Sequence, residues 1–389
     1  MSKGKFDFDR ETDRHDSFSL KWDVAPGELP MWVADMDFET APCVKEAVVK
    51  RAMSGIYGYS VTPDSYFEGV SDFFFRRSGY RFLPEHMVFC TGVVGAISSM
   101  VRKLTTPAEK VLLQPPVYNI FYNSILNNGR NVITSPLVYR EGEYCIDFAD
   151  LDEKLSDPQT TLMILCNPHN PVGKVWSGDE LSKIGELCHK HGVTVISDEI
   201  HSPLTDPGIS YTPFASASDI CAEISATCLA ASKAFNLAGL QSATVVAKDP
   251  VLRHRIWRGI NTDEVGEPNA FAMDANIAAY TKGDEWLDSL REYIYSNKCI
   301  VREYIKENLP RLKVVPSEAT YLLWIDISSY SGDSVAFAKR VRELTGLYLS
   351  DGAEYGEGGE HFVRMNVGTT SSRVRDGLDR LKRALDIIG

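Results

Sequence analysis

The stretch Ile224-Ser-Ala-Thr-Cys-Leu-Ala-Ala-Ser-Lys233 decides how this chain is interpreted. Its apolar and small residues indicate a buried strand, and Lys233 follows directly. A lysine is rarely buried without a chemical reason, because its ammonium group loses hydration. Desolvation at a strand end lowers the pKa of the amine, and such a lysine typically forms a Schiff base with a carbonyl compound. The alternative is a partly exposed lysine that extends from a loop.

Similar apolar runs recur through the middle of the chain and alternate with helical patterns. The runs predicted to be buried strands are 87–90, 111–113, 162–166, 193–196 and 226–229. Alternation of apolar strands with helices, such as those expected at 44–53, 95–104 and 179–191, is typical of a parallel sheet covered on both faces. The sequence therefore predicts an α/β fold with a large, mostly parallel sheet. In such a sheet, ligands bind at the carboxyl ends of the strands.

The pattern changes after Asn276. A long amphipathic helix is expected at 286–308, with a helix at 334–345 and another at 371–388. Strands are expected at 321–326 and 362–366. This order predicts a smaller α+β domain. We expect an N-terminal segment (1–45) that packs with the small domain, a large domain (46–280) and a small C-terminal domain (281–389).

Composition restricts the classes of function. The chain has 389 residues, of which 44% are hydrophobic and 24% charged, as expected for a globular protein of about two domains. A formal net charge of −12 argues against binding to nucleic acid or to an anionic membrane surface. No apolar stretch suggests a secretory signal or a membrane span. The eight cysteines are scattered without C-x-x-C spacing, which favours a reducing cytoplasm.

Two of the predicted strand ends carry residues suited to a phosphate and a flat ring. Thr91-Gly-Val-Val-Gly95 follows the first strand and opens a helix, whose free N–H groups can bind phosphate. An ordinary structural turn is the alternative. Pro115-Pro-Val-Tyr118 follows the second strand and supplies an aromatic ring that could stack on a ligand. A core tyrosine is the alternative there.

Two further strand ends carry polar residues. Asn167-Pro-His-Asn-Pro-Val-Gly173 contains two Asn-Pro steps, which favour an extended, turning loop whose amides could donate to a phenolate-type oxygen. Ser197-Asp-Glu-Ile-His201 places Asp198 at a buried strand end, where a carboxylate needs a cationic partner. The protonated pyridine nitrogen of pyridoxal 5'-phosphate (PLP) is such a partner, and PLP is also the carbonyl compound that such lysines most often bind.

Rival chemistries are less well supported by the residues. A metal site with Asp198 and His201 as ligands lacks a third ligand, so no metal is expected. A dyad of Ser232 and Lys233 is a poor nucleophile arrangement, because adjacent side chains diverge. No G-x-S-x-G elbow is present.

Taken together, these segments resemble the fold-type I PLP-dependent enzymes, the aspartate aminotransferase superfamily. The resemblance rests on Asn-Pro-His-Asn-Pro-x-Gly, Ser-Asp-Glu-Ile-His and Ser-Lys in this order, with Gly58-Tyr-Ser60 and Arg364-Met-Asn366, and covers nearly the whole chain. More narrowly, the chain resembles the cystathionine β-lyase or C–S lyase branch of MalY/PatB type. That likeness lies in the motifs Asp13-Arg-His-Asp16, Trp22-Asp23, Ala34-Asp-Met-Asp-Phe38, Gly173-Lys-Val-Trp176, Ser232-Lys-Ala-Phe-Asn236 and Tyr355-Gly-Glu-Gly-Gly359.

The resemblance implies a role for each candidate residue. Lys233 would bind the PLP carbonyl and move the substrate Cα proton, with Tyr59 and Tyr118 as further catalytic residues. Asp198 would hold the pyridine nitrogen protonated, and Asn170 and His201 would face the ring's 3-oxygen. The remaining cofactor-binding positions are the stacking ring of Tyr118, the phosphate-binding backbone of Gly92, Val93 and Val94, Ser232, and Tyr59 from the neighbouring subunit of a homodimer. Arg364 would pair with the substrate α-carboxylate, together with Asn170 and Tyr59 as substrate-binding residues.

One position departs from the superfamily pattern. Ala230 stands three residues before Lys233, where many members have a phosphate-binding serine. Phosphate binding from position 230 is therefore not expected, and Ser232 is the remaining candidate in this turn.

The function implied is a PLP-dependent carbon–sulfur β-lyase of methionine and cysteine metabolism. It would cleave cystathionine, cystine and related S-substituted cysteines to thiol, pyruvate and ammonia, and would act as a cytoplasmic homodimer on amino-acid substrates. A PLP-dependent aminotransferase is the first alternative, because both reactions begin with loss of the Cα proton. A regulatory binding protein with residual lyase activity is the second. The sequence leaves these alternatives open.

Overall fold

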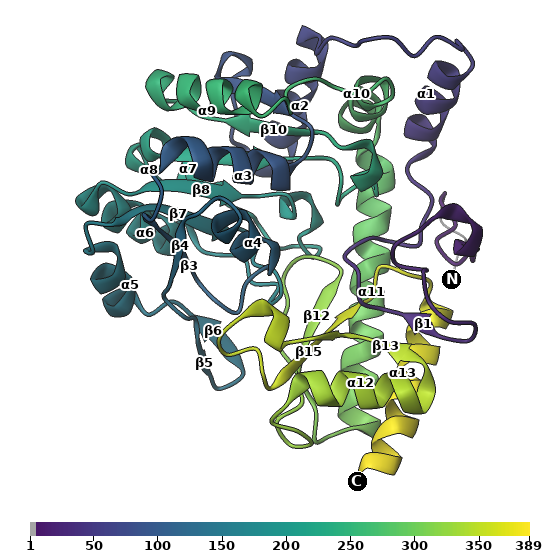
Figure 1. Ribbon diagram of the computed structural model, residues 1–389. Coiled ribbons are helices and arrows are strands. Elements are labelled where there is room, and N and C mark those ends of the chain that lie inside the picture. Colours follow the sequence, from purple (N-terminus) through teal and green to yellow (C-terminus); the bar gives the residue numbers. More distant parts are fainter. Residues whose placement is uncertain (1–4) are drawn as a thin grey trace.

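A seven-stranded, mostly parallel sheet forms the centre of the larger part of the molecule (Figure 1). The computed structural model describes residues 5–389. The strand order is β2 (Met87–Cys90), β10 (Ala243–Val246), β9 (Ser225–Leu229), β8 (Thr194–Asp198), β7 (Thr160–Cys166), β3 (Lys110–Leu113) and β4 (Asn131–Thr134). The five strands predicted from the sequence are confirmed, and β4 and β10 are additional.

Strand β10 is antiparallel to both of its neighbours, whereas the other pairs are parallel. The connection from β9 to β10 stays at the carboxyl edge of the sheet, where it carries Lys233. Because this connection does not cross a face of the sheet, the chain returns antiparallel. Strand β10 was not predicted from the sequence; it is four residues long and follows the connection that carries Lys233.

Helices cover both faces of this sheet, as predicted. Successive strand residues point to opposite faces, so Leu162 and Ile164 join one core cluster while Met163 and Leu165 join another. One cluster includes side chains from α3 (Val93–Leu104), α4 (Ile120–Leu126) and α9 (Pro250–Thr262). The other includes side chains from α5 (Phe148–Leu155), α6 (Gly178–His191), α7 (Phe214–Ala217) and α8 (Asp219–Ile224).

Local sequence signals set the ends of α6. Ser177 and Glu180 form a capping box at its start, and Gly192 ends it in the left-handed conformation with φ 71°. These signals explain why the helix expected at 179–191 is found within one residue of its predicted start.

A third core cluster joins the large sheet to four helices, α1 (Pro42–Ala52), α2 (Asp64–Ser78), α10 (Ala272–Lys282) and α11 (Asp284–Asn308). The long helix α11 runs along the molecule in Figure 1. Its first half contributes Trp286 and Leu290 to this cluster, and its second half contributes Val301 and Ile305 to the core beneath the second sheet. Helix α11 thus connects the two parts of the molecule.

The second sheet has four antiparallel strands in the order β11 (Lys313–Val314), β12 (Leu322–Asp326), β15 (Phe362–Asn366) and β14 (Ser350–Asp351). Its core cluster includes side chains from α12 (Ser334–Thr345) and α13 (Ser371–Ile388). Two short pairs complete the strands: β5 (Val138–Arg140) with β6 (Glu143–Cys145), and β1 (Leu29–Pro30) with β13 (Leu347–Tyr348). Five short 3-10 turns are η1 (His15–Ser17), η2 (Pro84–His86), η3 (Ser202–Leu204), η4 (Ala238–Leu240) and η5 (Ala353–Tyr355).

The division into 1–45, 46–280 and 281–389 stays a proposal. Its two boundaries fall inside helices α1 and α10. Among residues 5–389, no helix is both long and apolar enough to cross a membrane.

The N-terminal segment is held by a buried ionic cluster around Asp37. Lys21 Nζ lies 3.0 Å from Asp37 Oδ2, and both side chains are almost fully buried. Trp22 Nε1 donates to Asp37 Oδ1 at 2.8 Å, and Arg14 donates to the same oxygen at 3.0 Å. Burial by itself would raise the pKa of Asp37, but Lys21 and these hydrogen bonds hold it below its ordinary value.

We expect the Asp37→Asn variant to lower the free energy of unfolding by about 3 kcal/mol, because it removes the nearest carboxylate from the buried Lys21 and leaves only Asp35, whose Oδ1 lies 3.9 Å away. Chemical denaturation at pH 7 measures this loss. The matched control is Asp386→Asn, which removes an exposed pair with Lys382 and should change stability by less than about 1 kcal/mol. Equal effects of the two substitutions would contradict the role given to the Asp37 cluster.

Candidate active site

A pocket of about 460 Å³ lies at the carboxyl edge of the large sheet. The parallel strands bring their ends together there, and the loops that follow them form the walls. The residues that line the pocket are Ala34, Thr91, Gly92, Val93, Val94, Gly95, Tyr118, Cys166, Asn170, Asp198, Ile200, His201, Ser232, Lys233, Ala238, Gln241 and Ser242. The structure thus brings together nine of the eleven residues predicted from the sequence.

Lys233 lies in the turn after β9, and its ammonium group faces the pocket. Its Nζ donates a hydrogen bond to the carbonyl oxygen of Ala34 at 2.7 Å. Burial lowers the pKa of Lys233 to about 8, with a further lowering by the charge of Arg364 and opposition from Asp35 and Asp198. A fraction of the amine is therefore neutral near pH 7, as a nucleophile requires.

Asp198 is the last residue of β8 and is 5% exposed. Burial raises the pKa of its carboxyl to about 6, although the Ile200 N–H and the charge of Lys233 both lower it. The Ile200 N–H donates to Oδ1 at 3.2 Å. A carboxyl group with a raised pKa, beside a pocket, is a strong site for a cationic ligand atom.

Asn170 and Arg364 form the boundary between the large sheet and the second sheet. Arg364 Nη1 donates to Asn170 Oδ1 at 3.2 Å, and Nη2 donates to the Trp32 carbonyl at 2.7 Å. The buried Nε of Arg364 has no hydrogen-bond partner among the described residues. The guanidinium also lies over the ring of Tyr355, with 4.9 Å between its carbon and the ring centroid. Arg364 therefore retains a free donor for an anionic group beside the pocket.

His201 and Tyr118 are both held in neutral form. Burial lowers the pKa of His201, and the charges of Lys233 and Arg364 lower it further. Its buried Nδ1 lacks a hydrogen-bond partner in the described part of the chain. Burial raises the pKa of the Tyr118 phenol. A neutral imidazole and a neutral aromatic ring both suit a flat ligand that carries a polar oxygen.

The turn at Gly92 has the backbone that the sequence predicts. Gly92 adopts φ 135°, which side chains other than hydrogen rarely allow, and it precedes the first residue of α3. The first N–H groups of a helix have no partners inside the helix. Because Gly92, Val93 and Val94 line the pocket, these groups can bind a phosphate.

Two of the predicted residues lie outside the pocket lining. Arg364 adjoins it through Asn170, as described above. Tyr59 lies on the surface between α1 and α2 and is fully exposed, so within one chain it has no place in this site. Ser232 does line the pocket, next to Lys233.

The metal alternative gains no support. Among residues 5–389 no group of three His, Cys, Asp or Glu side chains could hold a metal ion. Asp198 and His201 both line the pocket, but they belong to no such group of three.

Sequence reasoning missed the part of the site formed by residues 32–36. The Ala34 carbonyl accepts hydrogen bonds from Lys233 Nζ and, at 2.9 Å, from the Tyr321 hydroxyl. The Asn366 side chain donates to the carbonyls of Val33 and Asp35. The motif at 34–38 was noted only as a mark of relationship, because a backbone carbonyl gives no signal in a sequence.

The residues present fit the PLP that the resemblance implies. Two groups lack partners that PLP would supply: the Asp198 carboxyl needs a cation, and His201 Nδ1 has no hydrogen-bond partner among the described residues. The turn at Gly92 supplies N–H groups for a phosphate, and Lys233 supplies an amine for a carbonyl.

The fold and this site define an α/β enzyme of the PLP-dependent class, with a buried lysine at its pocket after a central strand. The family model described as aminotransferase class I and II matches residues 29–381. A cystathionine β-lyase, PatB, of Bacillus subtilis is 43% identical, with 97% of this chain and 99% of the relative covered. The protein MalY of Escherichia coli is 32% identical over 98% of this chain and 99% of its own. The crystal structure of cystalysin from Treponema denticola, which contains PLP, is 31% identical, with 99% of this chain and 100% of that chain covered and a TM-score of 0.95. This chain therefore belongs to the aminotransferase class I and II family, in the branch of PatB and MalY.

The raised pKa of Asp198 predicts how stability depends on pH without a cofactor. The folded-state pKa of about 6 lies above the ordinary value, so the neutral carboxyl stabilises the fold at low pH and this contribution is lost as pH rises through about 6. Between pH 5 and pH 7.5, we expect the wild type to lose roughly 1.4 kcal/mol of stability relative to Asp198→Asn. Urea unfolding at both pH values measures the difference.

Added PLP should abolish this loss, because a protonated ring nitrogen stabilises the ionised carboxylate. Parallel pH profiles for the two proteins without PLP would contradict the raised pKa. A loss that persists with saturating PLP would contradict the pairing of Asp198 with a cationic ring nitrogen.

Proposed function

We propose that this protein is a PLP-dependent carbon–sulfur β-lyase. It cleaves cystathionine, cystine and related S-substituted cysteines to a thiol, pyruvate and ammonia. The observation that carries the proposal is the meeting of Lys233 and the buried Asp198 at one pocket. The likeness to a cystathionine β-lyase along nearly the whole of both chains supports the reaction type.

Each residue of the pocket has a defined task in this reaction. Bound PLP supplies an electron sink that stabilises negative charge on the substrate Cα. Asp198 sustains that capacity by keeping the ring nitrogen protonated. Lys233 would hold the cofactor through its carbonyl, and its free amine would remove the proton from the substrate Cα. Loss of this proton allows the thiol to leave from Cβ.

The remaining residues bind and orient. Arg364 pairs with the substrate α-carboxylate through a guanidinium that Asn170 and the Trp32 carbonyl hold in place. Tyr118 covers the ring, and His201 and Asn170 offer hydrogen bonds to its oxygen. The helix start at residues 92–94 holds the phosphate.

The charges at the pocket favour a substrate whose distal group varies. Lys233 is the only cationic side chain among the residues that line it, and Arg364 adjoins it. An aminotransferase for dicarboxylates needs a second cation for the second carboxylate. A single clamp for the α-carboxylate suits a lyase that accepts several sulfur-linked groups.

We expect purified protein with PLP to release pyruvate from L-cystathionine, and Lys233→Ala to lose this activity by at least about a thousandfold. The visible absorbance band of lysine-bound PLP should also disappear in the variant. Lys174→Ala, at a part-buried lysine outside the pocket lining, is the matched control and should keep both signals.

Other outcomes would identify the alternatives. An absorbance band without pyruvate, but with pyridoxamine phosphate formed from amino acids that lack a β-leaving group, would establish an aminotransferase. Full biological function of Lys233→Ala in cells would favour a regulatory binding protein. No band after PLP is added would refute the cofactor assignment.

We also propose a homodimer in which Tyr59 reaches the phosphate in the neighbouring subunit. Exposed apolar side chains surround Tyr59 in the sequence, namely Met53, Ile56, Tyr57 and Val61. A cluster of this kind on the surface is typical of an interface. A cytoplasmic location is proposed as well, supported by eight cysteines that are all free.

A mixing experiment tests the place of Tyr59. Tyr59→Ala and Lys233→Ala should each be nearly inactive alone, and dissociated and reassembled mixtures should regain up to about a quarter of wild-type activity. Half of the randomly formed dimers are hybrids, and each hybrid has one intact site. Tyr295→Ala, at another exposed tyrosine, should stay active. No recovery, or an active monomer in sedimentation, would refute the shared site.

A further inference from the structure

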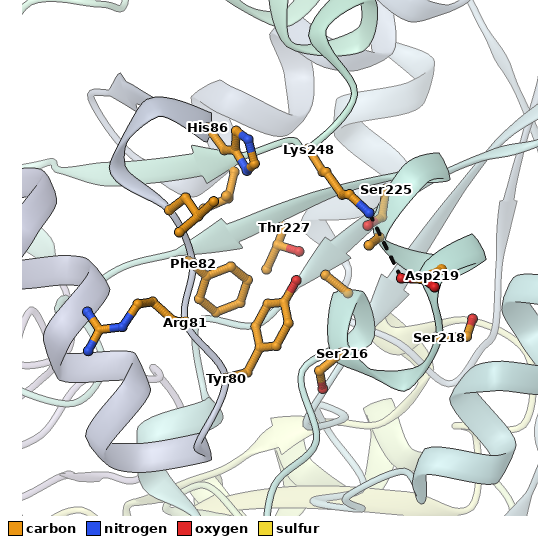
Figure 2. Close-up of a pocket in the computed structure, with 14 residues that line it drawn as sticks. Tyr80, Arg81, Phe82, His86, Ser216, Ser218, Asp219, Ser225, Thr227 and Lys248 are labelled. Carbon is orange, nitrogen blue, oxygen red and sulfur yellow. Dashed lines mark ion pairs between the residues drawn. The ribbon is translucent and has the colours of Figure 1, made fainter.

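A second cavity, of about 410 Å³, lies at the opposite edge of the large sheet (Figure 2). Ser225, the first residue of β9, and Thr227, in the middle of β9, line it together with Val246, the last residue of the antiparallel β10. It shares no lining residue with the pocket around Lys233. Its volume lies in the range of small-molecule sites. The β-lyase chemistry makes no use of it.

One wall of this cavity is apolar and aromatic, and the rest of the lining is polar and includes Ser216, Ser218 and Ser225. Phe82, Leu83, Ala222 and Val246 line it, and the ring of Tyr80 lies beside that of Phe82 in Figure 2. Burial raises the pKa of the Tyr80 phenol, and the negative charges of Glu199 and Asp219 raise it further. Tyr80 therefore remains a neutral hydrogen-bond donor beside an apolar wall, and this wall favours a flat, uncharged group of a ligand.

Thr227 places an unsatisfied hydroxyl group at the cavity. The residue is 1% exposed, and its Oγ1 has no hydrogen-bond partner in the part of the chain that the structure describes. Figure 2 shows Thr227 at the centre of the lining residues, with the aromatic rings on one side and Lys248 on the other. A buried hydroxyl group without a hydrogen-bond partner lowers stability. A ligand that places a polar atom beside Thr227 would supply the missing hydrogen bond.

The rim of the cavity carries one positive and one negative charge. Lys248 Nζ lies 4.0 Å from Asp219 Oδ1, and their side chains are 46% and 98% exposed. This loose, solvated pair contributes little to stability and is free to separate around a ligand.

The other cations at the rim are neutralised. Arg81 is paired with Asp72, and burial lowers the pKa of His86, with the charge of Arg253 lowering it further. The free charges at the rim therefore balance, which suits a zwitterion better than an anion.

We propose that this cavity binds an α-amino acid with a flat aromatic side chain that ends in a hydroxyl group. Its carboxylate pairs with Lys248 and its ammonium group with Asp219. The ring lies against Phe82 and Tyr80, and its hydroxyl group meets Thr227. The site binds this amino acid without reacting with it.

The test uses the PLP-loaded protein and calorimetric titration with L-tyrosine and L-phenylalanine, which differ only in the hydroxyl group. We expect one saturable site at which L-tyrosine binds about tenfold more tightly, because only L-tyrosine satisfies Thr227. Thr227→Val should remove the preference between the two, while Lys248→Met should weaken both by a similar factor. 4-Hydroxyphenylpropionate, which lacks the ammonium group, should bind less tightly than L-tyrosine.

Two further readouts keep the test decisive. Thr227→Val replaces an unsatisfied hydroxyl by a methyl group of the same shape, so its thermal unfolding midpoint should equal or exceed that of the wild type. The visible band of the cofactor is recorded during each titration and should not change. Absence of a saturable site, equal binding of the two amino acids by the wild type, or heat that follows a change in the cofactor band would each overturn the proposal.

Discussion

The parallel pairing of β7, β8 and β9 is the constraint on which the rest of the structure depends. Its register aligns Cys166 with Asp198, and Asp198 with Cys228, at one edge of the sheet. The three loops that follow these strands are far apart in the sequence, and they therefore begin side by side at the carboxyl edge of the sheet. Asn170, His201 and Lys233 lie in these loops, so hydrogen bonds between strands set where each loop begins, and contacts with the second sheet and the N-terminal segment complete the positions of Asn170 and Lys233.

This arrangement keeps two titratable groups away from their ordinary pKa values. Burial favours the neutral forms of both Asp198 and Lys233, and it shifts one pKa upward and the other downward. The ligand that stabilises this site most is one that places a cation beside the Asp198 carboxylate and a carbonyl group beside the Lys233 amine. The unpartnered Nδ1 of His201 offers this ligand a further hydrogen-bonding position, and the unpartnered Nε of Arg364 is a donor for an anionic group beside it.

The N-terminal segment completes the site from outside the large sheet. The Ala34 carbonyl contacts both Lys233 and Tyr321, and Asn366 of β15 holds the carbonyls on either side. The ionic cluster around Asp37 anchors the same segment three residues later. The position of the Lys233 amine thus depends on the second sheet and on the start of the chain.

The sequence by itself determined the fold class, the five central strands, the main helices and the group of residues at the strand ends. Periodicity and apolar runs indicate which residues are buried. A lysine or an aspartate at the end of such a run is recognisable in the sequence as a charged residue in an apolar surrounding. Strand β10 and the carbonyl of Ala34 were decided only by the tertiary structure, as was the cavity at Thr227. Strand direction, the position of a backbone carbonyl and the absence of a hydrogen-bond partner arise from contacts between distant segments, and no local pattern of residue types encodes them.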